Sequence, residues 1–202
     1  MTEVALIDYG AGNIRSVTKA LQNMGLRVSI TNEACKIRTA DALILPGVGA
    51  FREAMKNLSP IKNEILDKVS TGTPLLGICL GLQLIFTRSY EFGVTDGLNL
   101  VAGEVVKLPR AVKLPHIGWN RIKIVNSNSL LDGVPDNAYM YFVHSYVVSP
   151  NQPQRVLATT SYGVSFPSVI AADNIVATQF HPEKSSSNGL KIIENFVRWV
   201  RR

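Results

Sequence analysis

Short apolar segments joined by turns that contain glycine and proline constrain this chain more than any other feature of its sequence. Residues 4–7, Ala42–Leu45 and 74–78 are apolar throughout, as strands are when both faces of a sheet are covered. Helical spacing of apolar residues follows, at about residues 14–24, 50–58, 61–69 and 80–86. This alternation predicts an α/β fold with an open, mostly parallel sheet flanked by helices.

The second half of the chain predicts mainly strands. Short extended segments separated by Pro, Asn, Gly and Ser precede a final helix over about 190–200, and they lie at 103–108, 121–125, 139–143, 155–160, 169–172 and 175–179. We expect these strands to form antiparallel hairpins that extend the same sheet. Because the chain shows no repeat, low-complexity segment or linker, a single domain over residues 1–202 is predicted.

Charge and composition exclude several classes of function. The formal net charge is +6, but the basic residues are scattered and no nucleic-acid-binding motif is present. No apolar run approaches the ~20 residues of a membrane helix, and the N-terminus lacks the features of a signal peptide. Two cysteines are too few for a disulfide framework. We therefore expect a cytoplasmic protein with two free thiols that binds neither nucleic acid nor membrane.

Cys79 lies between an apolar strand and a helix, in a G-x-C-x-G pattern over residues 77–81. This pattern predicts a sharp strand-to-helix turn, because the two glycines let strand and helix approach closely. The turn presents the side chain at the carboxyl edge of the sheet, where open α/β folds place their sites. The helix N-terminus favours a thiolate, and the N–H of Leu80 is a candidate oxyanion donor. A buried structural cysteine is the alternative.

His181 and Glu183 follow the last predicted strand and flank a proline. Residues two apart in an extended segment face the same side, and the proline fixes the backbone between them. The carboxylate can hold the imidazole in one tautomer while the other ring nitrogen faces a nucleophile. Taken alone, this triplet favours an ordinary surface loop with an incidental His and Glu. Together with Cys79, the order Cys–His–Glu predicts a catalytic triad.

Val48 lies between two glycines in the loop 46–49, directly after the strand Ala42–Leu45. Glycines at a strand end allow a peptide unit to turn its N–H into a site. The N–H of Val48 is therefore a candidate second oxyanion donor that can move. Taken alone, the pattern favours an ordinary tight turn.

Three further patterns give weaker predictions. Arg15 occupies the third glycine position of a dinucleotide loop that would start at Gly10, which argues against nucleotide binding. His116 and His144 have no zinc-ligand spacing, so no metal site is predicted and structural roles are expected, with His144 shaping the site as the alternative. Cys35 has neither a turn of this kind nor a base, and we expect it to be unreactive.

Together these patterns resemble the class I (triad) glutamine amidotransferase family over essentially the whole chain. The similarity rests on the Cys79 and His181 motifs and on the strings DYGAGN from Asp8, PGVGAF from Pro46, LPHIGWN from Leu114, YFVHSY from Tyr141 and HPEKS from His181. The resemblance implies a glutaminase with no metal or organic cofactor. It also implies a heterodimer in which ammonia passes to a (β/α)8-barrel synthase subunit of histidine biosynthesis.

The resemblance further implies roles for residues beyond the Cys79–His181–Glu183 triad. Val48 and Leu80 would form the oxyanion hole. Substrate L-glutamine would be held by Gly49, Gln83, Ser145 and Tyr146. Tyr141 and Lys184 would lie at the mouth that faces the partner subunit.

Two alternatives remain open on the sequence alone. The first is a triad glutaminase of another pathway, such as pyridoxal phosphate or purine synthesis, and co-purification with a barrel subunit distinguishes it. The second is a catalytically inactive regulatory subunit on the same fold. Labelling of Cys79 by a reactive glutamine analogue distinguishes the second.

Overall fold

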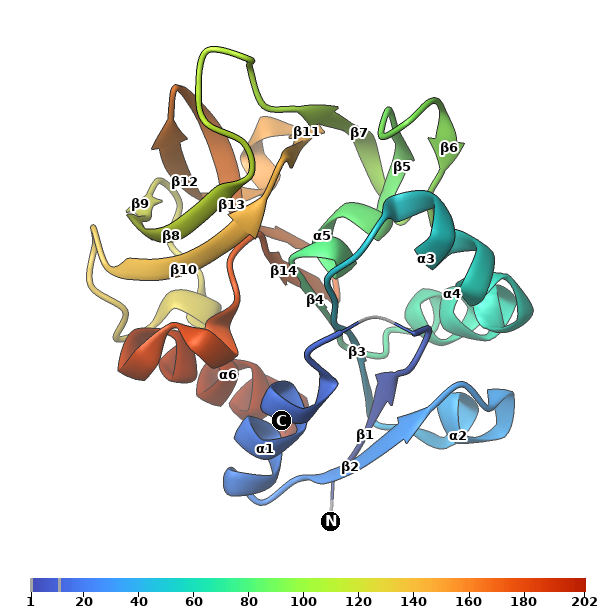
Figure 1. Cartoon of the computed structure of the whole chain (residues 1–202). Helices are drawn as coiled ribbons and strands as arrows, with labels where there is room; N and C mark the ends of the chain where they lie inside the picture. Colours follow the sequence, from blue (N-terminus) through green and yellow to red (C-terminus); the bar gives the residue numbers. More distant parts are fainter. Residues whose placement is uncertain (1, 11) are drawn as a thin grey trace.

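An eight-stranded sheet organises the structure, a computed structural model that describes residues 2–10 and 12–202 (Figure 1). The strand order is β2-β1-β3-β4-β14-β13-β12-β9. Pairs from β2 to β14 are parallel and pairs from β14 to β9 are antiparallel. The strands are β1 (Glu3–Ile7), β2 (Arg27–Thr31), β3 (Ala42–Leu45), β4 (Leu75–Ile78), β9 (Lys123–Ile124), β12 (Val156–Tyr162), β13 (Val164–Ala172) and β14 (Ile175–Thr178). The predicted fold class is confirmed.

Helices cover both faces of this sheet, as its fully buried strands β3, β4 and β14 require. One face packs on α1 (Ile14–Asn23) and α6 (Ser186–Val200). The other packs on α2 (Ala34–Thr39), α3 (Phe51–Leu58), α4 (Lys62–Ser70) and α5 (Leu80–Leu84). Short 3₁₀ turns complete the helical segments, at Ser59–Ile61, Ser129–Leu131, Pro153–Arg155 and Pro182–Lys184.

Two smaller sheets lie beside the main one. One pairs β8 (His116–Arg121) with β10 (Tyr139–His144), and the other has the order β11-β7-β5-β6. The strands of this four-stranded sheet are β5 (Phe86–Ser89), β6 (Thr95–Asp96), β7 (Val101–Lys107) and β11 (Tyr146–Pro150). The predicted strands 103–108 and 139–143 correspond to β7 and β10, so the prediction that they extend the main sheet was wrong. Burial alternates along β7 and β10, so one face meets the core and the other meets solvent.

Several element boundaries also differ from the prediction. Helix α2 was missed, because only Ile37 is buried along it and a short helix with one buried residue has no apolar stripe. The helix predicted over 80–86 ends at Leu84, and Phe86 begins a strand. The strand predicted over 121–125 shortens to β9, and α6 begins at Ser186 rather than near Leu190.

The junction between β4 and α5 has no room for side chains at its two glycines. A Cβ atom on Gly81 would lie 1.9 Å from the carbonyl oxygen of Leu45, and one on Gly77 would lie 2.9 Å from that of Gly81. Helix α5 therefore packs with its backbone directly on the end of β3. This close approach fixes the position of Cys79 between the two glycines.

We predict that Gly81→Ala lowers the free energy of unfolding by about 3 kcal/mol or more, because a methyl group must displace the Leu45 carbonyl. Urea denaturation measures this change. Gly72→Ala is the matched control, since no atom of the described residues lies within 4 Å of its added methyl and only its φ of +91° is unfavourable. It should cost about 1–2 kcal/mol. Equal losses in the two variants would contradict the steric account.

Candidate active site

Cys79 occupies the turn between β4 and α5 in a backbone conformation that is rare for a side-chain-bearing residue. Its φ is 53° and its ψ is −101°. The Cys79 N–H donates to the carbonyl of Thr178 at 2.7 Å, which ties the turn to the neighbouring strand β14. Only 4% of the residue is exposed. The sulfur lies 3.7 Å from the Val143 carbonyl and 3.8 Å from Nε2 of Gln179.

His181 and Glu183 form a buried pair just beyond the end of β14. Nδ1 of His181 lies 2.8 Å from Oε1 of Glu183, and both side chains are fully buried. Burial lowers the pKa of His181, but hydrogen bonding to Cys79 and Glu183, followed by the charges of these two groups, outweighs burial and raises that pKa above its usual value. The structure thus brings the three predicted triad residues together, from segments about 100 residues apart in sequence.

The second nitrogen of the His181 ring is available for proton transfer. Nε2 is buried and makes no hydrogen bond of normal geometry to any residue that the structure describes. Nδ1 must donate to the carboxylate of Glu183, because that carboxylate can only accept when ionised. The hydrogen bond to Glu183 therefore fixes the tautomer and the orientation of the His181 ring.

Asn13 adds a contact that the sequence did not reveal. Its Nδ2 donates to the same oxygen of Glu183 that accepts from His181. Asn13 precedes α1 and has a φ of 73°, a conformation that asparagine tolerates better than most residues. It belongs to the DYGAGN string, whose Ala11 lies outside the described residues.

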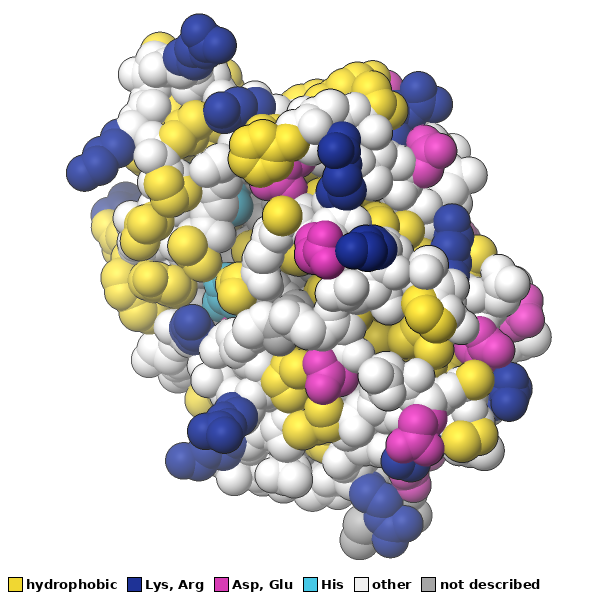
Figure 2. Space-filling model, turned by 45° about the vertical axis from the view of Figure 1, so that its right-hand side comes forward, with side chains coloured by type: hydrophobic (Ala, Val, Ile, Leu, Met, Phe, Trp, Pro, Cys, Tyr) yellow, Lys and Arg dark blue, Asp and Glu magenta, His cyan; other side chains and the backbone are white. Residues whose placement is uncertain are grey.

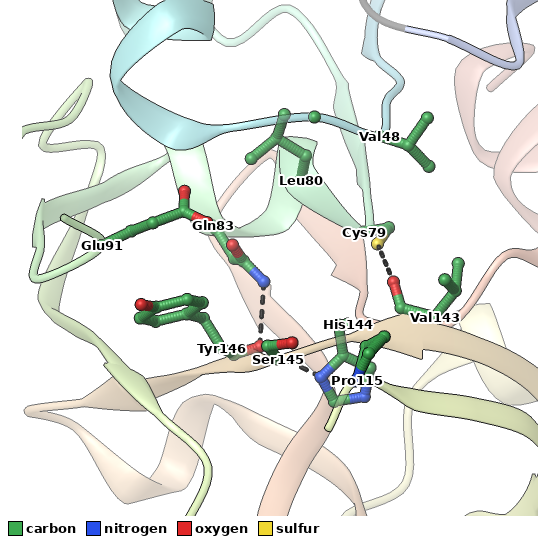
Figure 3. A pocket seen from close by; sticks show the side chains of 11 residues that line it. Val48, Cys79, Leu80, Gln83, Glu91, Pro115, Val143, His144, Ser145 and Tyr146 are labelled. Atoms are coloured by element: carbon green, nitrogen blue, oxygen red, sulfur yellow. Dashed lines mark hydrogen bonds between the residues drawn. The ribbon is translucent and has the colours of Figure 1, made fainter. Parts of the chain in front are cut away.

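A pocket of about 230 Å³ opens onto Cys79 (Figure 3). Among its lining residues are all those predicted to form the oxyanion hole and to bind substrate: Val48, Gly49, Leu80, Gln83, Ser145 and Tyr146. The remaining lining residues, besides Cys79, were not predicted as site residues: Glu91, Pro115, Val143 and His144. Glu91 is the only carboxylate among the described residues of this lining. It lies in a loop between two short strands, where no sequence pattern distinguishes it from a solvated surface residue.

The predicted oxyanion donors are not both free in this conformation. The N–H of Leu80 donates to the carbonyl of Gly47 at 3.3 Å. The Gly47 carbonyl and the Val48 N–H belong to one peptide unit and point in opposite directions. When the carbonyl meets Leu80, the N–H of Val48 therefore points away. Gly47 and Gly49 have φ values of 144° and 146°, which glycine adopts readily.

Both ends of this loop are held by side chains. The Tyr9 hydroxyl donates to the carbonyl of Pro46, and the carboxylate of Glu91 accepts the N–H of Phe51 at 2.6 Å. Burial, followed by the charge of Cys79, raises the pKa of Tyr9, so the hydroxyl remains a donor. The anchored ends leave the peptide between Gly47 and Val48 as the part that can turn.

An exposed aromatic face lies near the site on the ribbon of β8 and β10. Ile117, Trp119 and Tyr139 expose 60%, 53% and 48% of their surface, and Tyr141 packs edge-on against Trp119. Nζ of Lys184 lies 6.0 Å from the Tyr141 ring centre. Figure 2 shows hydrophobic side chains gathered on one side of the molecule, beside a recess in which histidine is visible. The two predicted interface residues, Tyr141 and Lys184, thus lie together at this face.

Other candidate features lie apart from the site. Cys35 is exposed on α2, near Glu33. Within residues 2–10 and 12–202, no group of three or more His, Cys, Asp or Glu side chains is arranged to hold a metal ion. No helix in the described part of the chain is long and apolar enough to cross a membrane.

Comparison with known families agrees with this geometry. The model of the family glutamine amidotransferase class-I matches residues 5–199. The chain belongs to this family and is a glutamine amidotransferase, as its sequence motifs predicted.

Its relatives place it more narrowly. The imidazole glycerol phosphate synthase subunit HisH of Aquifex aeolicus is 50% identical, over 96% of this chain and 95% of that protein. HisH of Methanocaldococcus jannaschii is 50% identical over 96% and 98%, and HisH of Caldanaerobacter subterraneus is 46% identical over 98% of each. Within the amidotransferases, the chain therefore belongs with the HisH subunits.

Solved structures share the fold at much lower sequence identity. A putative GMP synthase component from Thermoplasma acidophilum superimposes with a TM-score of 0.76 at 23% identity, over 100% of this chain and 94% of that one. A second structure, described as a glutamine amidotransferase, has a TM-score of 0.77 at 18% identity, over 98% and 99%. These similarities extend to the architecture alone.

We predict that Asn13→Gly lowers kcat for glutamine hydrolysis about 10-fold, because Glu183 loses a neighbour that holds its oxygen toward His181. Glycine keeps the left-handed backbone, so the effect reports the side chain. Asn13→Asp should lower kcat further, since a second carboxylate would then face Glu183. Steady-state kinetics at saturating glutamine measures both. Wild-type kcat in the Asp variant would contradict a role for this contact.

Proposed function

We propose that this chain hydrolyses L-glutamine to glutamate and ammonia through a thioester on Cys79. One observation carries the proposal: a pocket of about 230 Å³ ends on Cys79, and the buried His181–Glu183 pair lies beside that thiol. Glu91 supplies a negative charge for the substrate ammonium, and Gln83 supplies an amide oxygen. Gly49, Ser145 and Tyr146 line the wall that holds the amino-acid end.

In the first half of the reaction, the Cys79 thiolate attacks the side-chain amide carbon of glutamine. A carbon–sulfur bond forms and negative charge moves to the amide oxygen. His181 then gives its Nε2 proton to the amide nitrogen, and the carbon–nitrogen bond breaks to release ammonia. Glu183 stabilises the protonated ring throughout.

In the second half, water hydrolyses the glutamyl thioester. Neutral His181 takes a proton from the water, whose oxygen attacks the thioester carbon. The carbon–sulfur bond breaks, glutamate leaves and the thiolate returns. The reaction consumes only glutamine and water, so its atoms balance without a cofactor.

The oxyanion loop would act as a switch in this reaction. Turning the peptide between Gly47 and Val48 would free the N–H of Leu80 and aim the N–H of Val48 into the site in one movement. Both donors would then face the oxygen on which charge develops. Without that turn, the Gly47 carbonyl places partial negative charge where the oxyanion must form.

A partner subunit would use the ammonia and control the switch. We propose a heterodimer with a (β/α)8-barrel subunit, as the similarity to HisH subunits suggests. That subunit would form imidazole glycerol phosphate and aminoimidazole carboxamide ribotide for histidine biosynthesis, in the cytoplasm. The exposed aromatic face with Tyr141 and Lys184 would dock on it, because ammonia must reach the acceptor before water protonates it.

We predict that the free chain releases glutamate slowly and that barrel subunit plus its ribonucleotide ligand raises kcat by at least about 100- to 1,000-fold, which is the effect of a single oxyanion donor, since the turn supplies two. Glutamate release is measured for wild type and Cys79→Ala, each with and without partner and ligand. Cys79→Ala should show no turnover in any condition.

Two results would count against these assignments. Turnover by Cys79→Ala would remove the thioester mechanism. Equal wild-type rates with and without ligand would leave the mechanism standing but remove the switch.

We predict that Lys184→Glu raises the Kd for the barrel subunit at least about 10-fold, since the reversed charge lies beside Tyr141 at the proposed interface. Calorimetry measures the affinity. Lys191→Glu on α6 is the matched control, because Lys191 is also a surface lysine and pairs with Glu194 on the same helix. A similar Kd for Lys184→Glu and Lys191→Glu would place the interface elsewhere.

A further inference from the structure

A chain of hydrogen bonds runs from strand β8 through the protein interior to the sulfur of Cys79. We propose that Gln179 donates an N–H to this sulfur, and that His116 and His144 are positioning residues of the chain that orients Gln179. The inference rests on the proposed role of Cys79 as nucleophile. It adds three residues to the reaction. The sequence analysis expected structural roles for His116 and His144, with His144 shaping the site as the alternative, and did not predict Gln179 as a site residue.

The carbonyl of Tyr146 sets the direction of the whole chain. It can only accept, and two side chains meet it: Nδ1 of His144 at 3.0 Å and Nε2 of Gln83 at 3.0 Å. His144 must therefore carry its proton on Nδ1, and Gln83 must turn its nitrogen toward the strand (Figure 3). The two lone pairs of one main-chain oxygen thus fix two side chains at once.

From Gln83 the chain continues to the nucleophile. Nε2 of Gln83 also donates to Oε1 of Gln179 at 3.3 Å. With its oxygen so engaged, Gln179 must point its nitrogen the other way, and Nε2 lies 3.8 Å from the Cys79 sulfur. Gln179 is fully buried, so water cannot replace its contacts without entering the core. The arrangement also leaves Oε1 of Gln83 free for substrate.

From His144 the chain continues toward the surface. Because Nδ1 of His144 carries the proton, Nε2 is an acceptor, and Nδ1 of His116 lies 3.1 Å from it and must donate. Nε2 of His116 then accepts from Nδ2 of Asn120 at 3.3 Å. The orientation of Asn120 is fixed independently, since its Oδ1 accepts from the N–H of Arg121 and its Nδ2 donates to the Ser161 carbonyl. The Tyr146 carbonyl at one end and Asn120 at the other therefore both require that each histidine carries its proton on Nδ1.

The surroundings keep both histidines neutral, as the chain requires. His116 stacks on Tyr162 and Phe142, with ring centres 4.0 and 5.0 Å apart, and both histidines also pack edge-on against Phe166. Burial, with the charge His116 would carry as a second cause, lowers the pKa of His144 to about 3. Burial also lowers the pKa of His116. An added proton on either ring would set two N–H groups against each other.

The chain joins the thiol to the face proposed to meet the partner. His116 and Asn120 lie on the inner side of β8, while Ile117 and Trp119 on the same strand face outward. A shift of this ribbon would carry His116 and His144 together, and the contact of His144 with the Tyr146 carbonyl would pass the shift to Gln83 and Gln179. The Cys79 sulfur then receives or loses one donor.

The test is the rate at which iodoacetamide alkylates Cys79, in a Cys35→Ser background that removes the exposed thiol. Gln179→Leu keeps the size of the side chain and removes its donor. We expect alkylation at pH 7 to fall about 10-fold, because a charge-assisted hydrogen bond to the thiolate is lost. The deficit should close by about pH 10, where a thiol ionises without help. Glutamine takes no part in the alkylation, so the result is independent of whether the protein is a glutaminase.

Asn195→Ala is the matched control for lost stability, since this buried amide donates to two carbonyls beneath α6, away from the pocket. It should leave the alkylation rate unchanged. Nitrogen NMR of the unmodified protein tests the chain of hydrogen bonds itself. Both His116 and His144 should be neutral with the proton on Nδ1 at pH 7. An unchanged rate in Gln179→Leu, or either histidine protonated on Nε2, would overturn the proposal.

Discussion

The structure depends on the close approach of α5 to the ends of β3 and β4 at Cys79. Without a side chain at Gly81, helix backbone meets the Leu45 carbonyl, and Cys79 is held at a φ of 53°. Such a conformation costs energy and persists only where the surroundings determine it. Here the surroundings include the buried strands on either side. The core thus holds the thiol at the edge of the sheet, with the His181–Glu183 pair delivered by the adjacent strand β14.

Two main-chain carbonyls then determine how the polar groups of the site are oriented. The Gly47 carbonyl occupies the N–H of Leu80, and the Tyr146 carbonyl directs His144 and Gln83. Because a carbonyl can only accept, each imposes one arrangement on the polar groups around it. The Gly47 carbonyl can be released from Leu80 by turning the single peptide between Gly47 and Val48. The Tyr146 carbonyl is held by two donors, His144 and Gln83, and stays fixed unless the β8–β10 ribbon moves.

The sequence was sufficient for features that depend on local pattern. Apolar runs located β3 and β4, and glycine spacing located the turn at Cys79. Contacts between segments distant in sequence could not be predicted. One example is the contact of Asn13 with Glu183, 170 positions apart. Glu91 was missed because its role depends on a loop folding back onto α3. The occupied Leu80 N–H was also invisible, since the orientation of a peptide between two glycines is not encoded by residue type.

A structure of the complex with barrel subunit, ribonucleotide ligand and glutamine, in the Cys79→Ala variant, tests the central claim most directly. We expect the 3.3 Å contact between Leu80 N and Gly47 O to be broken in this complex. The Val48 and Leu80 nitrogens should then both lie about 3 Å from the amide oxygen of glutamine. If the Gly47 carbonyl still meets Leu80 in a complex whose unmodified form turns over glutamine rapidly, the loop is not the switch.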